Sequence, residues 1–160
     1  MINIIGLGYI GLPTALMMAA NGIEVIGTDY DSDLVTTLNQ GKPTFKENGL
    51  EELFNLAINA GIKFTDEYQA TGTYIISVPT PYDKFSKKVD PTHVIVAIKE
   101  VLKVCPKGAT IVIESTVSPG TIEKHIRPVI EEDGFEIGND VNLVHAPERI
   151  IPGNMIYELK

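Results

Sequence analysis

Three glycines near the amino terminus have the spacing of a phosphate-binding turn. Gly6, Gly8 and Gly11 form a Gly-x-Gly-x-x-Gly pattern between a short apolar run and the start of an expected helix. In such a turn the first glycine permits a tight bend, the second lets the backbone approach a pyrophosphate, and the third lets the helix pack closely on the strand. The backbone N–H groups of Tyr9 and Ile10 then point from the helix N-terminus at the phosphates. These five residues predict a dinucleotide site, and a tight turn without a ligand is the alternative interpretation.

Asp29 stands where a dinucleotide-binding fold contacts the ribose of its cofactor. It ends the second apolar run of the sequence, about 20 residues beyond the glycine turn. A carboxylate at this place accepts a hydrogen bond from a ribose 2′-OH and repels a 2′-phosphate, so it favours NAD over NADP. The alternative role for Asp29 is to cap the helix that follows the strand. NAD is the predicted cofactor.

Apolar runs alternate with helix-like segments along the whole chain. The expected strands are Ile2–Ile5, Glu24–Asp29, Ile62–Thr65, Tyr74–Val78, Thr110–Glu114 and Val141–His145. The expected helices are Leu12–Asn21, Asp31–Gln40, Leu50–Ala60, Pro91–Val104 and Thr121–Asp133, the last kinked or shortened by Pro128. Pro79–Asp90 carries two prolines and mixed charge, so we expect it to be a loop.

This alternation predicts the fold class. The strands are apolar runs without clean alternation, which is typical of strands that are buried on both faces. Together with the intervening helices they predict an α/β, Rossmann-like, doubly wound parallel sheet with helices on both faces. We expect residues 1–146 to form this domain and residues 147–160 to begin the connection to a further domain. A frayed terminus is the alternative for that last segment.

The composition excludes several classes of function. The chain has 160 residues, of which 44% are hydrophobic and 21% charged, and a formal net charge of −8. This surplus of acid argues against a broad nucleic-acid-binding face, which needs excess Lys and Arg. Residues 1–23 carry no charge, but glycines and Pro13 divide them and no basic residue precedes them, so we expect no membrane segment. We expect a cytoplasmic protein.

Four segments of the chain carry recognisable motifs. They are Gly6-Leu7-Gly8-Tyr9-Ile10-Gly11-Leu12-Pro13, Val78-Pro79-Thr80-Pro81, Glu114-Ser115-Thr116-Val117-Ser118-Pro119-Gly120-Thr121 and His145-Ala146-Pro147-Glu148-Arg149-Ile150-Ile151-Pro152-Gly153. Together they resemble the UDP-glucose/GDP-mannose dehydrogenase family, and the resemblance runs the length of the chain. Within the family it is greatest to the branch that oxidises UDP-N-acetyl-D-mannosamine.

The resemblance implies an activity and a set of roles. Members of the family oxidise C6 of a nucleotide sugar from alcohol to carboxylate in two NAD-dependent steps. By resemblance, Thr80 and Thr116 lie beside the cofactor. Arg149 and Ile150 help to hold the UDP-sugar, and Glu148 matches a catalytic glutamate linked to the water step. The alternatives are turn hydroxyls for the two threonines and exposed charges for Glu148 and Arg149.

The resemblance also leaves alternatives for substrate and assembly. UDP-glucose dehydrogenases carry a second glutamate where this chain has Pro152, which weakens that assignment. UDP-GlcNAc, UDP-glucose and GDP-mannose 6-dehydrogenases remain alternatives, as does an NAD-binding module without catalysis. A full-length enzyme is expected to be a homodimer or larger oligomer and this chain a monomer. Because the catalytic cysteine of the family lies in a later domain, we expect this chain to be inactive by itself.

Other reactive side chains are given structural roles. Cys105 is the single cysteine, and it precedes Pro106 at the end of an expected helix, so no internal disulfide is possible. His93 and His125 are expected to be solvated. His145 ends a strand at the edge where the ligand is expected, but only its position argues for an acid–base role. No spacing of His, Cys, Asp or Glu predicts a metal site.

Overall fold

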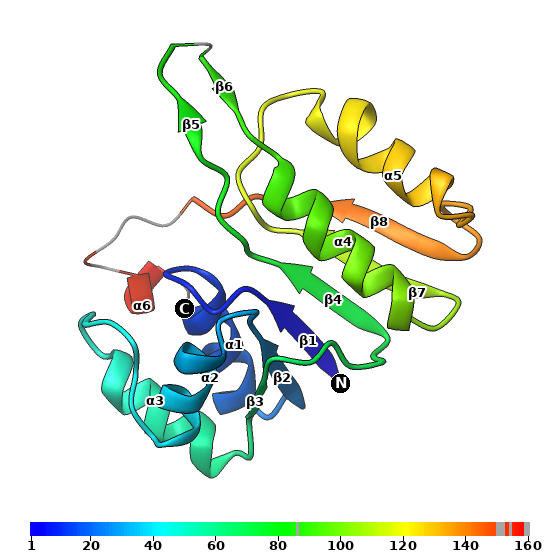
Figure 1. The fold of residues 1–160 in the computed structure, drawn as a ribbon. Coiled ribbons are helices and arrows are strands. Elements are labelled where there is room, and N and C mark those ends of the chain that lie inside the picture. Colours follow the sequence, from blue (N-terminus) through cyan, green and yellow to red (C-terminus); the bar gives the residue numbers. More distant parts are fainter. Residues whose placement is uncertain (86, 150–152, 154, 159–160) are drawn as a thin grey trace.

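Six parallel strands form the centre of the molecule (Figure 1). The computed structural model describes residues 1–85, 87–149, 153 and 155–158. The strands are β1 (Ile2–Ile5), β2 (Val25–Thr28), β3 (Lys63–Thr65), β4 (Thr73–Ile76), β7 (Ala109–Ile113) and β8 (Val141–His145). Their order across the sheet is β3-β2-β1-β4-β7-β8. The winding therefore reverses between β1 and β4, as in doubly wound folds, and the predicted fold class is confirmed.

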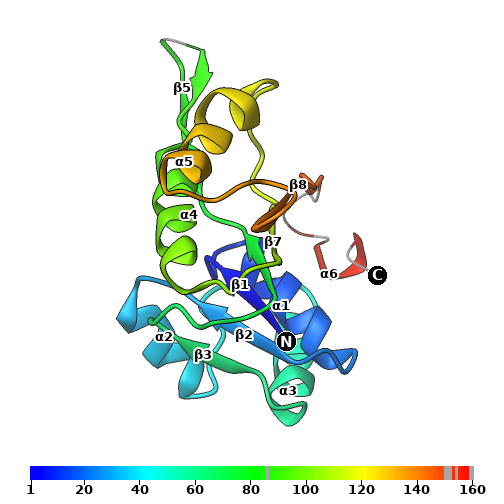
Figure 2. The ribbon, with the colours of Figure 1, turned by 90° about the vertical axis from the view of Figure 1, so that its right-hand side faces the viewer.

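Helices cover both faces of this sheet (Figure 2). The first face carries α1 (Gly11–Ala20), α2 (Ser32–Asn39) and α3 (Leu50–Asn59). The second face carries α4 (Thr92–Val104), the π-helix η1 (Ile122–Ile126) and α5 (Arg127–Glu132). A short helix, α6 (Met155–Glu158), joins the first group through Ile156. Parallel neighbours need crossover connections, and these crossovers place the helices on the faces.

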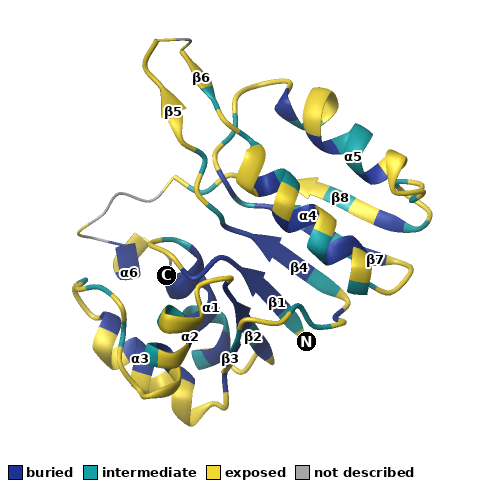
Figure 3. Cartoon of the chain, in the orientation of Figure 1, coloured by how far each residue is buried: buried dark blue, intermediate teal, exposed yellow. Residues whose placement is uncertain are grey.

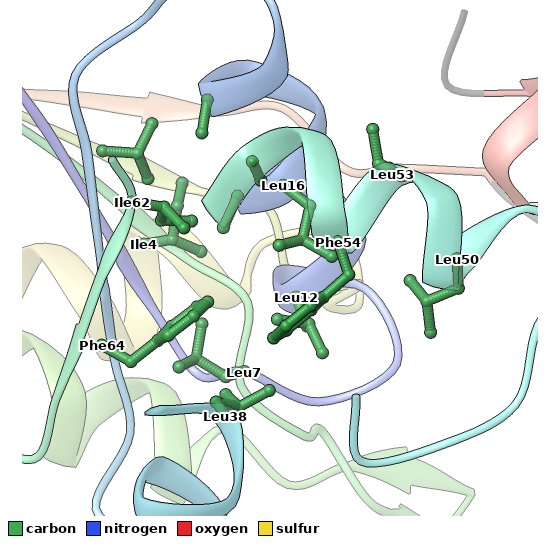
Figure 4. Close-up of a cluster of buried hydrophobic side chains, with 14 of the residues drawn as sticks. Ile4, Leu7, Leu12, Leu16, Leu38, Leu50, Leu53, Phe54, Ile62 and Phe64 are labelled. Carbon is green, nitrogen blue, oxygen red and sulfur yellow. The ribbon is translucent and has the colours of Figure 1, made fainter. Parts of the chain in front are cut away.

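The two faces of β1 build two separate hydrophobic clusters. Ile4 belongs to the cluster of the first face, where Leu12, Leu16 and Phe54 are also buried (Figure 4). Ile5 belongs to the cluster of the second face, beneath α4. Figure 3 shows β1 and β4 as mostly buried strands at the centre. Because successive side chains of a strand point to opposite faces, a strand that serves both clusters is apolar without alternation.

The segment that we expected to be a loop contains a short hairpin. β5 (Tyr82–Asp83) and β6 (Lys88–Val89) pair antiparallel, with Tyr82 opposite Val89, and they project away from the sheet (Figure 1). The prediction of a loop at Pro79–Asp90 therefore missed these two short strands. Both prolines of the segment precede β5, where they remove no hydrogen bond from the ladder.

Pro128 distorts the helix predicted at Thr121–Asp133, as expected. The α-helical part is α5, with Pro128 in its first turn, and the five residues before it form η1. Proline cannot donate a backbone hydrogen bond and its ring clashes with the preceding turn, so the helix widens there. The prediction of a kinked or shortened helix is confirmed.

The uncharged amino-terminal run divides into β1 and α1, as the sequence predicted. The glycine turn separates the two elements, and Pro13 lies within the first turn of α1, where its missing N–H costs no hydrogen bond. Within the described part of the chain, no helix combines the length and the apolarity that are needed to cross a membrane.

Candidate cofactor-binding site

The glycine turn joins β1 to α1 at the carboxyl-end edge of the sheet, and two of its glycines are required by the fold. Gly6 has a φ of 91°, and a Cβ there would lie 2.8 Å from the carbonyl oxygen of Ser77. A Cβ on Gly11 would lie 1.8 Å from the carbonyl oxygen of Gly6. The turn is thus packed against itself and against the end of β4, which explains why side chains are excluded at these two positions.

Gly8 differs from its two neighbours in the motif. Its φ is outside the left-handed range, and a Cβ there would meet no atom within 4 Å. The fold therefore places no demand for glycine at this position. Gly8 instead lines two adjoining cavities at this edge of the sheet. A backbone that faces open space between two cavities is suited to the close approach of a ligand.

The first cavity, of about 350 Å³, lies between the carboxyl ends of β1 and β2 and α4. Its apolar wall includes Leu34, Val96 and Ala97. Its acidic groups are Asp29, Asp31 and Glu100. Apolar walls suit a flat aromatic base, and carboxylates suit sugar hydroxyls, so the cavity has the chemistry to hold a nucleoside.

Asp29 lies at the end of β2 and is 8% exposed. Its Oδ2 accepts a hydrogen bond from the N–H of Leu7 at 2.7 Å, and its Oδ1 accepts one from the N–H of Asp31 at 3.0 Å. Each carboxylate oxygen has a second lone-pair site, so both can still accept from a ligand. Asp29 therefore holds the glycine turn as well as facing the cavity, a structural task that the sequence did not indicate.

The helix cap that was the alternative role for Asp29 belongs to Asp31. The carboxylate of Asp31 accepts from the N–H groups of Asp33 and Leu34 at 3.0 and 3.1 Å, at the N-terminus of α2. Asp29 thus binds the glycine turn, and Asp31 caps α2.

Tyr68 contributes a neutral hydroxyl to the first cavity. Burial raises the pKa of Tyr68 to about 12, and the negative charges of Glu100 and Asp29 add to this rise. The phenol is therefore protonated at every physiological pH and available as a donor. His93, which we expected to be solvated, is exposed and lines the mouth of the same cavity.

The second cavity, of about 310 Å³, adjoins the first and shares Gly8, Ser77, Val78 and Pro79 with it. Tyr9 and Ile10 form its side nearest the turn. Thr80, Thr116 and Glu148, all predicted site residues, also line it.

The two predicted threonines are in direct contact. The hydroxyl of Thr80 donates to the carbonyl oxygen of Thr116 at 2.8 Å. Thr80 follows β4 and Thr116 follows β7, which are neighbouring parallel strands, so their carboxyl ends meet at one edge. Arg149 is exposed and is absent from the described lining of both cavities. Ile150 lies outside the described residues.

Glu114 is a lining residue of the second cavity that the sequence analysis missed. Its carboxylate accepts hydrogen bonds from the hydroxyls of Ser77 and Thr14, the latter at 3.4 Å. Burial raises the pKa of Glu114, and the charge of Glu148 adds to this rise, whereas the two hydroxyls oppose it. We had assigned Glu114 to the end of a strand. β7 ends one residue earlier, so the side chain belongs to the functional edge.

A second missed residue supports the turn from the α2–α3 connection. The ring of Phe45 stacks on that of Tyr9, with centroids 4.3 Å apart. In the same connection, the carboxylate of Glu47 accepts from the N–H groups of Gly153 and Met155 at 2.9 and 3.3 Å. Gly153 and the first residue of α6 are therefore bound to the connection that also contacts the glycine turn.

Cys105 lies away from both cavities. It follows α4 and precedes β7, which places it at the amino-end edge of the sheet. Burial raises the pKa of its thiol, so the reactive thiolate is disfavoured. His145 is exposed at the end of β8. In the described part of the chain, no group of three His, Cys, Asp or Glu side chains is arranged to hold a metal ion.

Known proteins resemble this chain over its full length. Residues 1–160 match the NAD-binding domain of the UDP-glucose/GDP-mannose dehydrogenase family. UDP-N-acetyl-D-mannosamine dehydrogenases from Methanococcus aeolicus and Campylobacter jejuni are 40% and 37% identical to it. The matches cover 99% and 98% of this chain and 36% and 40% of the relatives.

Solved structures give the same result. The UDP-N-acetyl-mannosamine dehydrogenase of Staphylococcus aureus aligns with a TM-score of 0.91 and 38% identity, over 99% of this chain and 39% of that one. The GDP-mannose dehydrogenase of Pseudomonas aeruginosa, solved as a ternary complex, aligns with a TM-score of 0.90 and 30% identity, over 99% and 38%. The chain thus spans less than half the length of these relatives. It belongs to the UDP-glucose/GDP-mannose dehydrogenase family, as the NAD-binding domain of that family.

Proposed function

We propose that the chain binds NAD across its two cavities, with the pyrophosphate at Gly8. The observation that carries this proposal is that Gly8 faces open space shared by both cavities although neither its backbone conformation nor its packing requires glycine. A pyrophosphate joins two nucleosides, so a ligand centred at Gly8 extends into one cavity on each side. The backbone N–H groups at the start of α1 favour the negative charge of the phosphates.

The lining of the two cavities supports a placement for each half of the cofactor. The adenosine half belongs to the first cavity, because Asp29 stands there to accept from the ribose hydroxyls and apolar side chains flank the base. The nicotinamide half then belongs to the second cavity, beside Thr80 and Thr116. Bound NAD supplies the hydride acceptor of the reaction.

We propose that the full-length enzyme is a UDP-N-acetyl-D-mannosamine 6-dehydrogenase. The first relatives carry this name, and the resemblance of the Pro-Glu-Arg segment supports it. The reaction is the two-step oxidation of C6 to the uronic acid. Glu148, which lines the second cavity, takes part in the water step, and Arg149 and Ile150 hold the nucleotide sugar. Assembly into a homodimer or larger oligomer rests on the resemblance alone, as does cytoplasmic localisation.

Cofactor preference tests the assignment of Asp29. The chain is expected to bind NAD more tightly than NADP, because the carboxylate repels a 2′-phosphate. Asp29→Asn removes the charge and leaves one oxygen for the N–H of Leu7, at the cost of the hydrogen bond from the N–H of Asp31, so we expect the preference to fall by about tenfold, or ~1.4 kcal/mol. Calorimetric titration of both cofactors measures the two affinities.

Asp33→Asn is the matched control. It removes one negative charge from α2, the helix that follows Asp29 in the chain, outside the first cavity, and is expected to leave the preference unchanged. NADP bound as tightly as NAD by the unmodified chain would contradict the proposed role of Asp29.

The chain is also expected to bind NAD without turnover. Its only thiol, Cys105, lies at the amino-end edge, and burial raises the pKa of that thiol. Incubation with NAD and UDP-N-acetyl-D-mannosamine should therefore produce no NADH absorbance. Turnover that disappears in Cys105→Ser would show that Cys105 is the nucleophile, and turnover that persists in this variant would show that no thiol is needed.

A further inference from the structure

The charged side chains that line the second cavity are acidic. Among its described lining residues, Glu114 and Glu148 are the two that carry a charge, and neither Lys nor Arg is present. The cavity adjoins the turn at which the pyrophosphate is proposed to bind. A carboxylate repels a phosphate, so these two acids disfavour the binding of the pyrophosphate. Any stabilisation that they provide must therefore act on another part of the ligand.

Glu114 is built into the wall of this cavity. It follows β7, and its two carboxylate oxygens accept separately from Ser77, at the end of β4, and from Thr14, in α1. Hydrogen bonds accepted on both oxygens stabilise the ionised carboxylate and so oppose the rise in the pKa of Glu114 that burial and Glu148 cause. These contacts fix the carboxylate of Glu114 in the wall of the second cavity.

The nicotinamide ring has a different charge in its two oxidation states. The oxidised ring is a cation and the reduced ring is neutral, whereas the rest of the cofactor is the same in both. A fixed negative charge near the ring therefore stabilises the oxidised form selectively, and its effect on the phosphates cancels when the two forms are compared.

We propose that Glu114 makes the second cavity select NAD⁺ over NADH. This inference rests on the proposed placement of the nicotinamide in that cavity. Selection of this kind suits an enzyme that oxidises its substrate, because the cofactor needed for the next step binds tightly and the reduced product leaves. Glu114 is thus a residue that determines specificity for the oxidation state of the cofactor.

Substitutions that separate charge from shape test the proposal. Glu114→Gln keeps the size of the side chain and one of its two acceptor oxygens but removes the charge, whereas Glu114→Asp keeps the charge and shortens the chain. The measured quantity is the ratio of the dissociation constants for NADH and NAD⁺, from calorimetric titration of the 160-residue chain. We expect Glu114→Gln to lower this ratio by about tenfold and Glu114→Asp to retain it.

Three controls isolate the effect on the ring. ADP-ribose lacks the nicotinamide, so its binding shows whether the phosphate site is intact in each variant. Glu100→Gln removes a charge from the first cavity and should change both affinities by the same factor. Thermal melting shows whether each variant is folded, and Glu114→Ala serves as the neutral variant if glutamine disturbs the packing.

The outcomes separate this proposal from the proposed function. If the unmodified chain binds neither NAD⁺ nor ADP-ribose, the proposed function fails. If both bind and a folded neutral variant leaves the NADH to NAD⁺ ratio unchanged, the selective role of Glu114 is overturned while the proposed function stands. A ratio that falls equally in the Gln and Asp variants also overturns it, because the effect then follows shape and not charge.

Discussion

Gly8→Val is expected to abolish NAD binding while the fold stays intact. The new side chain would occupy the space between the two cavities, where the pyrophosphate is proposed to approach the backbone. We expect the affinity for NAD to fall by at least about 100-fold, or ~2.8 kcal/mol. The free energy of unfolding should change by less than ~0.5 kcal/mol, because a Cβ at this position meets no atom within 4 Å.

Calorimetric titration and urea unfolding measure these two quantities on the same sample. Gly8→Ala is the graded control, since a single methyl group intrudes less and should weaken binding by a smaller factor. Normal NAD binding by a folded Gly8→Val variant would show that the pyrophosphate does not bind at this turn.

Gly11→Ala is expected to damage the fold itself. Its Cβ would lie 1.8 Å from the backbone carbonyl of Gly6 and 3.0 Å from Cβ of Ser77, so neither neighbour can move away without shifting β1, β4 or α1. We expect a loss of ~3 kcal/mol or more, a large part of the stability of about 5–15 kcal/mol that is typical of a domain. For a chain of this size the melting temperature falls by about 2–4 °C per kcal/mol.

Gly8→Ala is the matched control for Gly11→Ala. The two substitutions are chemically identical and lie three positions apart in one motif, yet only the first meets a backbone atom. Equal melting temperatures for the two variants would contradict the description of the turn. The expected pattern is a lower melting temperature for the first and weaker NAD binding for the second.

Much of this architecture could be predicted because each feature depends on local chemistry. The strands are apolar at nearly every position because they serve two clusters, as Ile4 and Ile5 of β1 do. The tasks of Gly6 and Gly11 follow from the spacing of the motif, and the steric contacts of both agree with it. The edge at which Thr80 and Thr116 meet follows from the parallel direction of the strands.

The features that escaped prediction depend on contacts between distant segments. Nothing near Glu114 in sequence indicates that Ser77 and Thr14 will donate to it, so its place in the second cavity required the structure. The same is true of the hydrogen bond from Leu7 to Asp29, and of the stacking of Phe45 on Tyr9. The hairpin β5–β6 was missed because its prolines precede the strands instead of interrupting them.

Residues that follow four different strands of the sheet line the second cavity. Its wall draws on the turn after β1 and on the residues that follow β4, β7 and β8, such as Thr80, Thr116 and Glu148. In the central pair of strands, Ile2 is in register with Thr73, a pairing that closes a long loop of chain. No partly folded chain that lacks one of these strands presents the cavity. A ligand confined to it therefore stabilises the domain by mass action as a single cooperative unit, by an amount that grows with the concentration of the free ligand.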